Sequence, residues 1–209
     1  FDWDSFKENR DIAEEKYNVA FLEENLFKYT AKTKTPQGIA AVINRRSYTL
    51  EHILSNDKYF VAVLDGVQDP GNVGTIIRTL ACAGADGVVL LDGCADPYSA
   101  KALRATMGSI FRIPTYEVVN EKELFSHLLD RNTHIMISHL QGENLFNWKS
   151  GCDRIALIIG NEGRGVRDEL LEYASSLIKI PILGGAESLN ASVASGIIIY
   201  EIVRKNMFQ

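Results

Sequence analysis

The pattern of hydrophobic and polar positions changes near residue 59. From there on, short continuous apolar runs alternate with segments in which apolar residues recur at a helical period. The apolar runs predict strands at 59–64, 88–91, 113–119, 134–140, 154–159 and 177–182. The periodic segments predict helices at 73–83, 98–109, 121–131, 166–174 and 190–205. Because apolar strands that alternate with helices are buried on both faces, the pattern predicts an α/β fold with a mostly parallel sheet and helices on both faces.

Upstream of residue 59 the pattern is more polar and less regular. The elements predicted there are a charged helix at 4–16, a short strand at 18–22, a helix at 23–31 and an apolar strand at 39–43. A turn containing proline and glycine precedes the last of these. Residues 47–58 are polar and mixed and are interpreted as a linker, so the expected domains are 1–46 and 59–209.

Composition narrows the class of protein. With 46% hydrophobic and 23% charged residues, the 209-residue chain is ordinary globular protein. No apolar run approaches the roughly 20 residues that span a bilayer, and nothing resembles a signal peptide, so we expect no membrane association and a cytoplasmic location. Cys82, Cys94 and Cys152 are odd in number and widely spaced, which favours reduced thiols over a disulfide framework or a metal site.

The charged residues are unevenly placed along the chain. A net charge of −5 argues against a protein that coats nucleic acid non-specifically. Basic residues nevertheless gather in two groups, and the candidates for phosphate contacts among them are Arg45, Arg46, Lys101, Arg104 and Arg112. For each of these the alternative is an ordinary solvated side chain.

Polar and glycine residues follow three of the predicted strands, at the ends where parallel sheets bind ligands. The first such loop, 64–74, contains Asn72, a good helix N-cap, and Gly74, and it leads into a helix that carries Arg78 one turn from its start. A cation there is opposed by the helix dipole, which favours an anionic partner such as a phosphate. A tight turn with a surface arginine is the alternative.

The second loop, 156–166, follows a fully apolar strand and has glycines at 160, 163 and 165 around Glu162. Glycines let a ligand approach the backbone closely, and Glu162 is placed to orient a substrate. The order of the glycines matches neither the GxGxxG turn of a dinucleotide site nor a P-loop. A flexible connection with a solvated glutamate is the alternative.

The third loop follows the strand that ends at Ile180-Pro181 and enters a helix that starts with an unusual run of small residues. Ser188 or Asn190 can cap this helix. The small residues leave room for a ligand or another element. The alternative is tight packing in a core or a dimer interface, which also suits the apolar later part of the helix at 197–200.

Together the three loops resemble the three sequence motifs of the SpoU-type (TrmH-like) RNA 2′-O-ribose methyltransferases of the SPOUT superfamily. The first is similar to the motif N-x-G-x-x-x-R in Asn72, Gly74 and Arg78. The second resembles G-x-E-G-x-G and the third I-P…S-L-N-x-S-x-A. The residues that match these two are Gly160, Glu162, Gly163, Gly165, Ile180, Pro181, Ser188, Leu189, Asn190, Ser192 and Ala194. The motifs occur in the family's order, and the resemblance covers residues 59–209.

The resemblance implies a C-terminal deep trefoil knot, a homodimer through the knotted domain, and S-adenosylmethionine as the cofactor held in the knot. The residues implied in cofactor binding are His139, Leu140, Gly160, Asn161, Gly163, Ile180, Pro181, Ile182, Leu189, Asn190 and Ala194. The segment 33–43 resembles the end of the L30-like RNA-binding domain often fused to this family. Residues 1–46 are therefore expected to be a partial L30-like α/β segment.

The reaction implied by the resemblance is methyl transfer from S-adenosylmethionine to a ribose 2′-hydroxyl in RNA, without a metal. Arg78 is the principal catalytic candidate, either as a base or as an anchor for the adjacent phosphate. Because an arginine is essentially always protonated, we favour the anchoring role. Asn72, Glu162, Ser188 and Asn190 are expected to form a hydrogen-bonded shell that positions Arg78 and the ribose.

The RNA itself is only partly constrained. The L30-like segment favours ribosomal RNA over transfer RNA. Two other classes of protein stay open: a nucleotide-binding oxidoreductase on a doubly wound sheet, and a non-catalytic RNA-binding protein on the same fold. The missing GxGxxG turn argues against the first. The presence of Arg78, Glu162 and Asn190 together argues against the second.

Overall fold

A computed structural model describes residues 15–31, 35–36, 38–149 and 151–207 of the chain. Contacts between Cα atoms divide the chain into two compact units, Phe1–Arg46 and Ser47–Gln209. All strands of the described chain belong to the second unit.

The first unit contains helix α3 (Glu24–Ala31), which confirms the helix predicted at 23–31. The strands predicted at 18–22 and 39–43 are wrong, because these residues form no strand. A strand needs a neighbour for its backbone hydrogen bonds, and the described part of this unit has none. Of the helix predicted at 4–16, all but the last two residues lie outside the described residues. The L30-like character of this unit stays a prediction.

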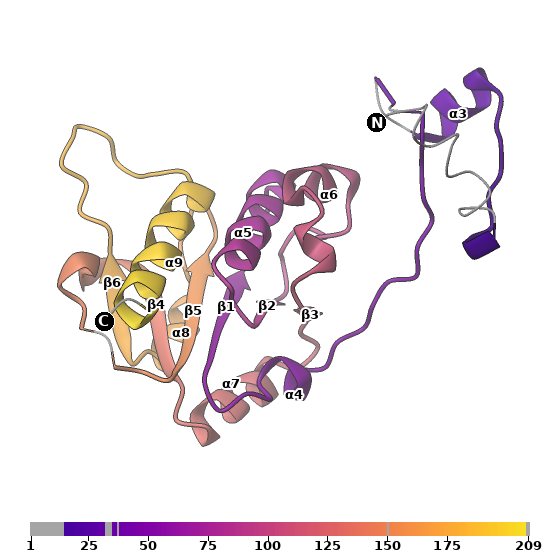
Figure 1. Ribbon diagram of the computed structural model, residues 1–209. Coiled ribbons are helices and arrows are strands. Elements are labelled where there is room, and N and C mark those ends of the chain that lie inside the picture. The colour runs from indigo at the N-terminus through magenta and orange to yellow at the C-terminus, as the bar shows by residue number, and fades with distance from the viewer. Residues whose placement is uncertain (1–14, 32–34, 37, 150, 208–209) are drawn as a thin grey trace. The chain divides into compact units, whose positions relative to one another are not determined.

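The second unit is built on a six-stranded parallel sheet with the strand order β3-β2-β1-β5-β4-β6 (Figure 1). The strands are β1 (Tyr59–Asp65), β2 (Gly87–Leu90), β3 (Thr115–Glu117), β4 (His134–Asn144), β5 (Arg154–Gly160) and β6 (Ser176–Lys179). The central strands β1 and β5 are almost entirely buried, which explains why both are continuous apolar runs in the sequence. The predicted parallel sheet is confirmed.

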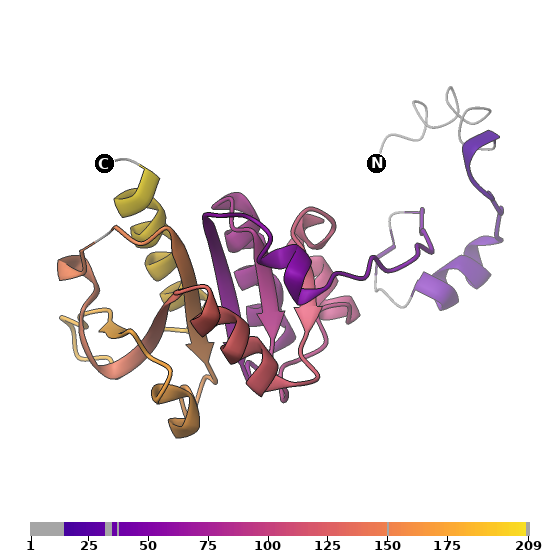
Figure 2. The same cartoon turned by 90° about the horizontal axis from the view of Figure 1, so that it is seen from below.

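Helices cover both faces of this sheet, as predicted. They are α4 (Leu50–Ile53), α5 (Pro70–Cys82), α6 (Ala100–Thr106), α7 (Glu121–Asp130), α8 (Asp168–Leu171) and α9 (Ala191–Met207), with 3-10 turns η1 (Ser109–Phe111) and η2 (Leu145–Asn147). Alternate residues of β1 face opposite sides: Ala62 packs in the core cluster with α5 and α9, and Val61 packs with α4, α7 and α8. Figures 1 and 2 show α5 and α9 on one face and α7 and α8 on the other. Within the described residues, no helix is long and apolar enough to cross a membrane.

The segment 47–58, interpreted as a linker, is part of the second unit. Its helix α4 buries Leu50, Ile53 and Leu54 to between 2% and 6% exposure, in the core on one face of the sheet. A Cβ on Gly87 would lie 2.5 Å from a methyl carbon of Ile53, so the glycine at the start of β2 makes room for α4. The linker interpretation is wrong because a helix of one turn has too few apolar positions to show a helical period.

The C-terminal segment returns from the edge of the sheet to its middle. Strand β6 lies at the edge beside β4, whereas α9, which follows it along the chain, packs against α5. Residues 180–190 make this crossing. The deep trefoil knot implied by the resemblance stays a prediction.

Candidate functional site

The first two motif loops lie side by side because β1 and β5 are neighbours in the sheet. Their register pairs Asp65 with Gly160, so both strands end at the same level. The side chain of Asn161 joins the two loops, since its Nδ2 donates a hydrogen bond to the carbonyl oxygen of Gly66 at 2.8 Å. The carboxyl ends of the two central strands thus form the floor of the candidate site.

A chain of hydrogen bonds runs through all three motif loops. Nδ2 of Asn72 donates to Oε1 of Glu162 at 3.0 Å, and Nδ2 of Asn190 donates to Oδ1 of Asn72 at 3.1 Å. The paired residues are separated by 90 and 118 positions in the sequence. The structure therefore brings together three of the four residues expected in the hydrogen-bonded shell.

The carboxylate of Glu162 also receives two backbone hydrogen bonds. The N–H groups of Gln68 and Asp69 donate to it, each at 3.2 Å. Partial desolvation pushes the pKa of Glu162 upward, but the hydrogen bonds from Asn72 and from these backbone groups outweigh it and hold the pKa below the ordinary value of 4.5. The fold therefore favours the charged form of Glu162.

Acid is expected to weaken this connection between the loops. Because the pKa of Glu162 is lowered in the folded state, its contribution to stability is complete above the ordinary value and is lost as the pH falls through the folded value. In urea unfolding between about pH 6 and pH 3, we expect the midpoint of the wild-type chain to fall more steeply than that of Glu162→Gln, and the two to converge in acid. If the urea midpoints of the two chains changed in parallel with pH, the charged carboxylate would add nothing to the stability of the folded state.

Asp69 caps the N-terminus of helix α5 and links this helix to α6. Its Oδ1 accepts a hydrogen bond from the backbone N–H of Asn72 at 3.0 Å, so the expected N-cap, Asn72, is wrong. Because Asn72 lies inside the helix, its side chain can serve the chain of hydrogen bonds instead. Lys101 of α6 pairs with Asp69 at 2.6 Å, and this contact, together with the N–H of Asn72, lowers the pKa of Asp69.

A buried ion pair fixes the far end of the second loop. Asp65, the last residue of β1, is completely buried and accepts hydrogen bonds from the backbone N–H of Arg167 at 2.8 Å and from its Nε at 2.6 Å. Arg167 also pairs with Glu121 at the start of α7, at 2.9 Å. The sequence-based predictions named none of these three residues. The available signal was a carboxyl residue ending an apolar run, since a buried charge requires a partner.

The glycines of the second loop serve the protein's own backbone. Asn161 and Gly165 exchange two backbone hydrogen bonds of 3.0 Å, which folds the loop tightly over the end of β5. A Cβ on Gly160 would lie 2.2 Å from the backbone nitrogen of Val166. The loop's own backbone therefore fills the space beside the α-carbon of Gly160, and a role of this residue in cofactor binding stays a prediction. Gly163 is more open, since a Cβ there would meet only the side chain of Asn161 at 3.6 Å.

Arg78 lies outside the chain of hydrogen bonds. It is exposed on α5, and its guanidinium has no hydrogen-bond or ion-pair partner among the described residues. Helix α5 begins at Pro70, so Arg78 lies about two turns from its start rather than one. The argument from the helix dipole is weakened accordingly, because the dipole acts within the first turn. Ser188 also lies outside the chain of hydrogen bonds, on the exposed segment 182–190.

The candidates for cofactor binding lie in the middle of β4, at the ends of β5 and β6, and at the start of α9. Strand β4 is irregular where it pairs with β6, and His139 and Leu140 lie in that irregularity. Aliphatic side chains are exposed here: Leu140 by 82%, and Ile182 and Leu189 by 39% each. The remaining candidates follow β5 and β6 or start α9, and they are Gly160, Asn161, Gly163, Ile180, Pro181, Asn190 and Ala194. Apolar surface beside polar backbone at strand ends fits a nucleoside such as adenosine.

The basic candidates differ in how their charges are used. Arg45 and Arg46 belong to the first unit. In the second unit the charge of Lys101 is paired with Asp69. Arg104 and Arg112 are exposed, and in the part of the chain that the structure describes neither side chain has a hydrogen-bond or ion-pair partner.

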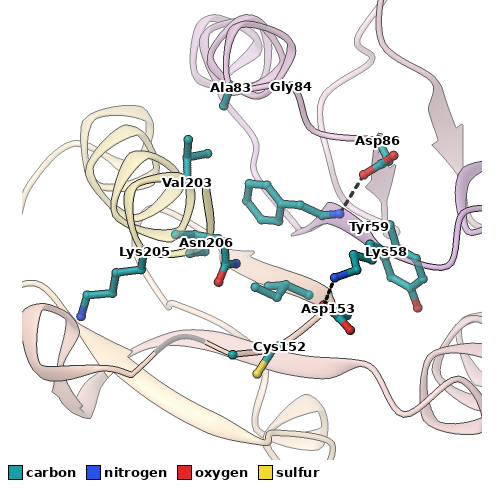
Figure 3. Close-up of a pocket in the computed structure, with 14 residues that line it drawn as sticks. Lys58, Tyr59, Ala83, Gly84, Asp86, Cys152, Asp153, Val203, Lys205 and Asn206 are labelled. Atoms are coloured by element: carbon teal, nitrogen blue, oxygen red, sulfur yellow. Dashed lines mark hydrogen bonds and ion pairs between the residues drawn. The ribbon is translucent and has the colours of Figure 1, made fainter. Parts of the chain in front are cut away.

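A cavity of about 400 Å³ lies at the opposite ends of the central strands, where β1 and β5 start (Figure 3). Tyr59 and Phe60 line it together with Val203 from the end of α9. Lys58 and Asp153 form an ion pair of 2.7 Å beside it, drawn as a dashed line in Figure 3. None of the motif residues lines this cavity, so it is separate from the candidate site.

Among the described residues, one group of side chains has the identity and spacing of metal ligands. Glu51 of α4 and Glu123 and His127 of α7 place their ligand atoms within 4.8 Å of one another. The group is exposed or half-buried and includes no motif residue.

Comparison with known proteins places the motif loops in a family context. A model of the SpoU rRNA Methylase family matches residues 59–200. The chain is 39% identical over 181 residues to the 23S rRNA (guanosine(2553)-2′-O)-methyltransferase RlmP of Bacillus subtilis (strain 168), covering 87% of this chain and 71% of that protein. It is 34% identical over 150 residues to the putative TrmH family tRNA/rRNA methyltransferase YacO of the same strain, covering 72% of this chain and 60% of YacO.

The fold is also similar to solved structures. An AdoMet-bound rRNA methyltransferase from Sinorhizobium meliloti aligns with a TM-score of 0.84 and 30% identity, covering 98% of this chain and 79% of that one. The crystal structure of the A. aeolicus TrmH/SpoU tRNA modifying enzyme aligns with a TM-score of 0.64 and 29% identity, covering 72% of this chain and 77% of that one. The family match contains all three motif loops.

Proposed function

The chain belongs to the SpoU rRNA Methylase family, and we propose that it transfers a methyl group from S-adenosylmethionine to the 2′-hydroxyl of a ribose in ribosomal RNA. The observation that carries the proposal is the chain of hydrogen bonds from Glu162 through Asn72 to Asn190, which joins the three motifs in one site. Ribosomal RNA is favoured because the relative RlmP is a 23S rRNA 2′-O-methyltransferase. Because the chain belongs to this family, the alternative of a nucleotide-binding oxidoreductase is set aside.

The residues in the irregular part of β4, at the ends of β5 and β6 and at the start of α9 would hold the cofactor. The exposed aliphatic side chains of Leu140, Ile182 and Leu189 offer apolar surface to the adenine ring. When bound, S-adenosylmethionine supplies the activated methyl group, and the S. meliloti relative was solved with it bound. The deep trefoil knot, the partial L30-like character of residues 1–46 and a cytoplasmic location belong to the same proposal.

The proposed reaction would form a bond between the ribose 2′-oxygen and the methyl carbon of S-adenosylmethionine. The sulfur would keep the electron pair of the broken sulfur–carbon bond, which leaves S-adenosylhomocysteine, and the hydroxyl proton would pass to solvent water. Arg78 presents an unpaired guanidinium on α5 and anchors the phosphate next to the target ribose. Asn72, Glu162 and Asn190 position the start of α5, and with it Arg78, against the other two loops. Ser188 is the remaining candidate for a contact with the ribose.

We also propose that the chain forms a homodimer through the exposed face of α9. Val193 and Tyr200 are 52% and 50% exposed, and with the half-buried Ile197 they follow one side of the helix. The charge of Arg204 further along is paired with Glu201 at 2.8 Å. An apolar helix face of this kind suits burial against a second copy. Light scattering would then give about twice the 23.2 kDa mass of one chain.

The test of the activity is a map of ribose methyl groups in RNA from cells with and without the gene. Loss of one ribose methyl from ribosomal RNA supports the proposal, and guanosine 2553 of 23S rRNA, the position that RlmP acts on, is inspected first. Loss from transfer RNA alone would establish the transfer-RNA alternative. Loss of a base methyl instead would refute the reaction type. RNA binding by the purified chain without any lost methyl would establish the non-catalytic alternative.

A further inference from the structure

The segment from the end of α6 through η1 exposes two large apolar side chains. Met107 is 73% exposed and Phe111 is 53% exposed. Ile110, between them, is buried in the core cluster that includes residues of α5. Helix α5 packs against both α6 and η1. The two exposed side chains therefore stand on a turn that is anchored to the same helix that carries Arg78.

Met107 has a backbone conformation that favours glycine. It ends α6 with φ 48° and ψ 40°, in the left-handed region, and Gly108 follows with φ 82°. Glycine or asparagine is usual at this place after a helix, because other side chains are strained there. Since most of the Met107 side chain contacts no other part of the protein, packing does not explain why a methionine stands at this strained position.

Unpaired positive charges flank the two apolar residues along the sequence. Arg104 lies in the last turn of α6, and Arg112 directly follows η1. Both are exposed, as is Arg78 on the neighbouring helix, and none of the three has a side-chain partner within the described ranges. A symmetric contact of this turn with a second copy would bring these charges together, whereas the exposed face of α9 avoids this. The charges instead complement RNA phosphates.

We propose that Met107 and Phe111 form a stacking surface for one unpaired RNA base, with Arg104 and Arg112 on the phosphates beside it. This inference rests on the proposed function and adds to it that the substrate nucleotide lies in an unpaired stretch of RNA. Aromatic side chains recognise single-stranded RNA by stacking on bases that a duplex would hide. A methionine side chain adds a polarisable, adaptable surface beside the ring.

The test measures binding of the full chain to a fluorescent RNA hairpin with an unpaired loop, and to the same hairpin with abasic nucleotides in the loop. Phe111→Ala is expected to lower the affinity for the intact loop about tenfold, and to leave the affinity for the abasic loop unchanged. Phe111→Trp should keep the preference for the intact loop. Leu129→Ala is the matched control, because Leu129 is 50% exposed at the end of α7, and it should change neither affinity.

A second variant separates this role from a role in folding. Met107→Gly relieves the left-handed backbone, so its Tm is expected to stay unchanged or rise while the preference for the intact loop falls. A lower Tm with an unchanged preference would overturn the proposal. The proposal would also be overturned if Phe111→Ala still distinguished the two hairpins. The same holds if Phe111→Ala left RNA binding unchanged and light scattering showed that it turned a dimer into a monomer. If no methyl is lost in cells but the loop preference holds, the proposed function fails and the stacking surface stands.

Discussion

Arg78→Ala is expected to lower the rate of methyl transfer by about 100-fold or more, and to leave the affinity for S-adenosylmethionine nearly unchanged. The arginine is exposed and has no partner in the described structure, so its removal should not disturb the fold. The loss would arise because the phosphate beside the target ribose is no longer held, and the 2′-oxygen is no longer aligned with the methyl group. Transfer of a labelled methyl group to RNA measures the rate, and calorimetry measures the affinity for the cofactor.

Arg78→Lys separates the two roles considered for this residue. Lysine keeps the charge but not the two parallel hydrogen bonds of a guanidinium, so an anchoring role predicts partial activity with little change in pH dependence. A base role predicts that the lysine variant becomes more active as the pH rises towards the ordinary pKa of lysine, about 10. Full activity of Arg78→Ala would contradict both roles.

Arg167→Ala is expected to lower the free energy of unfolding by about 3 kcal/mol. Asp65 is completely buried, and the Nε of Arg167 at 2.6 Å brings the compensating charge to its carboxylate. Without that side chain the carboxylate stays buried and keeps only the backbone hydrogen bond from residue 167. Urea unfolding at neutral pH measures the loss. Because Arg167 directly follows the second loop, the affinity for S-adenosylmethionine should fall as well.

A double variant shows whether the buried charge causes this loss. In Asp65→Asn/Arg167→Ala the neutral amide needs no compensating charge, so the double variant should be more stable than Arg167→Ala by about 1 kcal/mol or more. Lys58→Ala is the control for an ion pair at the surface. Lys58 and Asp153 are 77% and 67% exposed, and losing their contact should cost less than about 1 kcal/mol. Equal effects of Arg167→Ala and Lys58→Ala would contradict the account of Asp65.

The success and failure of the predicted elements have a common physical reason. Strands such as β1 and β5 are buried on both faces, so their apolar runs are visible without any knowledge of their neighbours. The segment 39–43 is equally apolar, but no strand lies beside it in the described part of its unit, and its backbone pairs with nothing that would make it a strand. For helix α4 the opposite error occurred, since a buried element was interpreted as a linker. Its burial depends on the space beside Gly87, and a helix of one turn shows no periodic pattern.

For the candidate site, too, the sequence identified some features and only the structure showed the others. The motifs identified Asn72, Glu162 and Asn190 by residue type and order. They did not show that Asp69 caps α5, and that Asn72 is thereby left to join the other two. They suggested that the glycine at 160 lets a ligand approach, whereas the space a Cβ would occupy there is filled by the loop's own backbone.

The sequence by itself determined which chemistry this protein can perform, because the three motifs and the strand ends that carry them are local features of the chain. Only the tertiary structure decided which of these residues meet. Asn72 contacts Glu162 because β1 and β5 are adjacent in the sheet, and it contacts Asn190 because α9 returns from the sheet edge to α5. Contacts across 90 and 118 positions depend on strand order and helix packing, and neither leaves a signal in local periodicity.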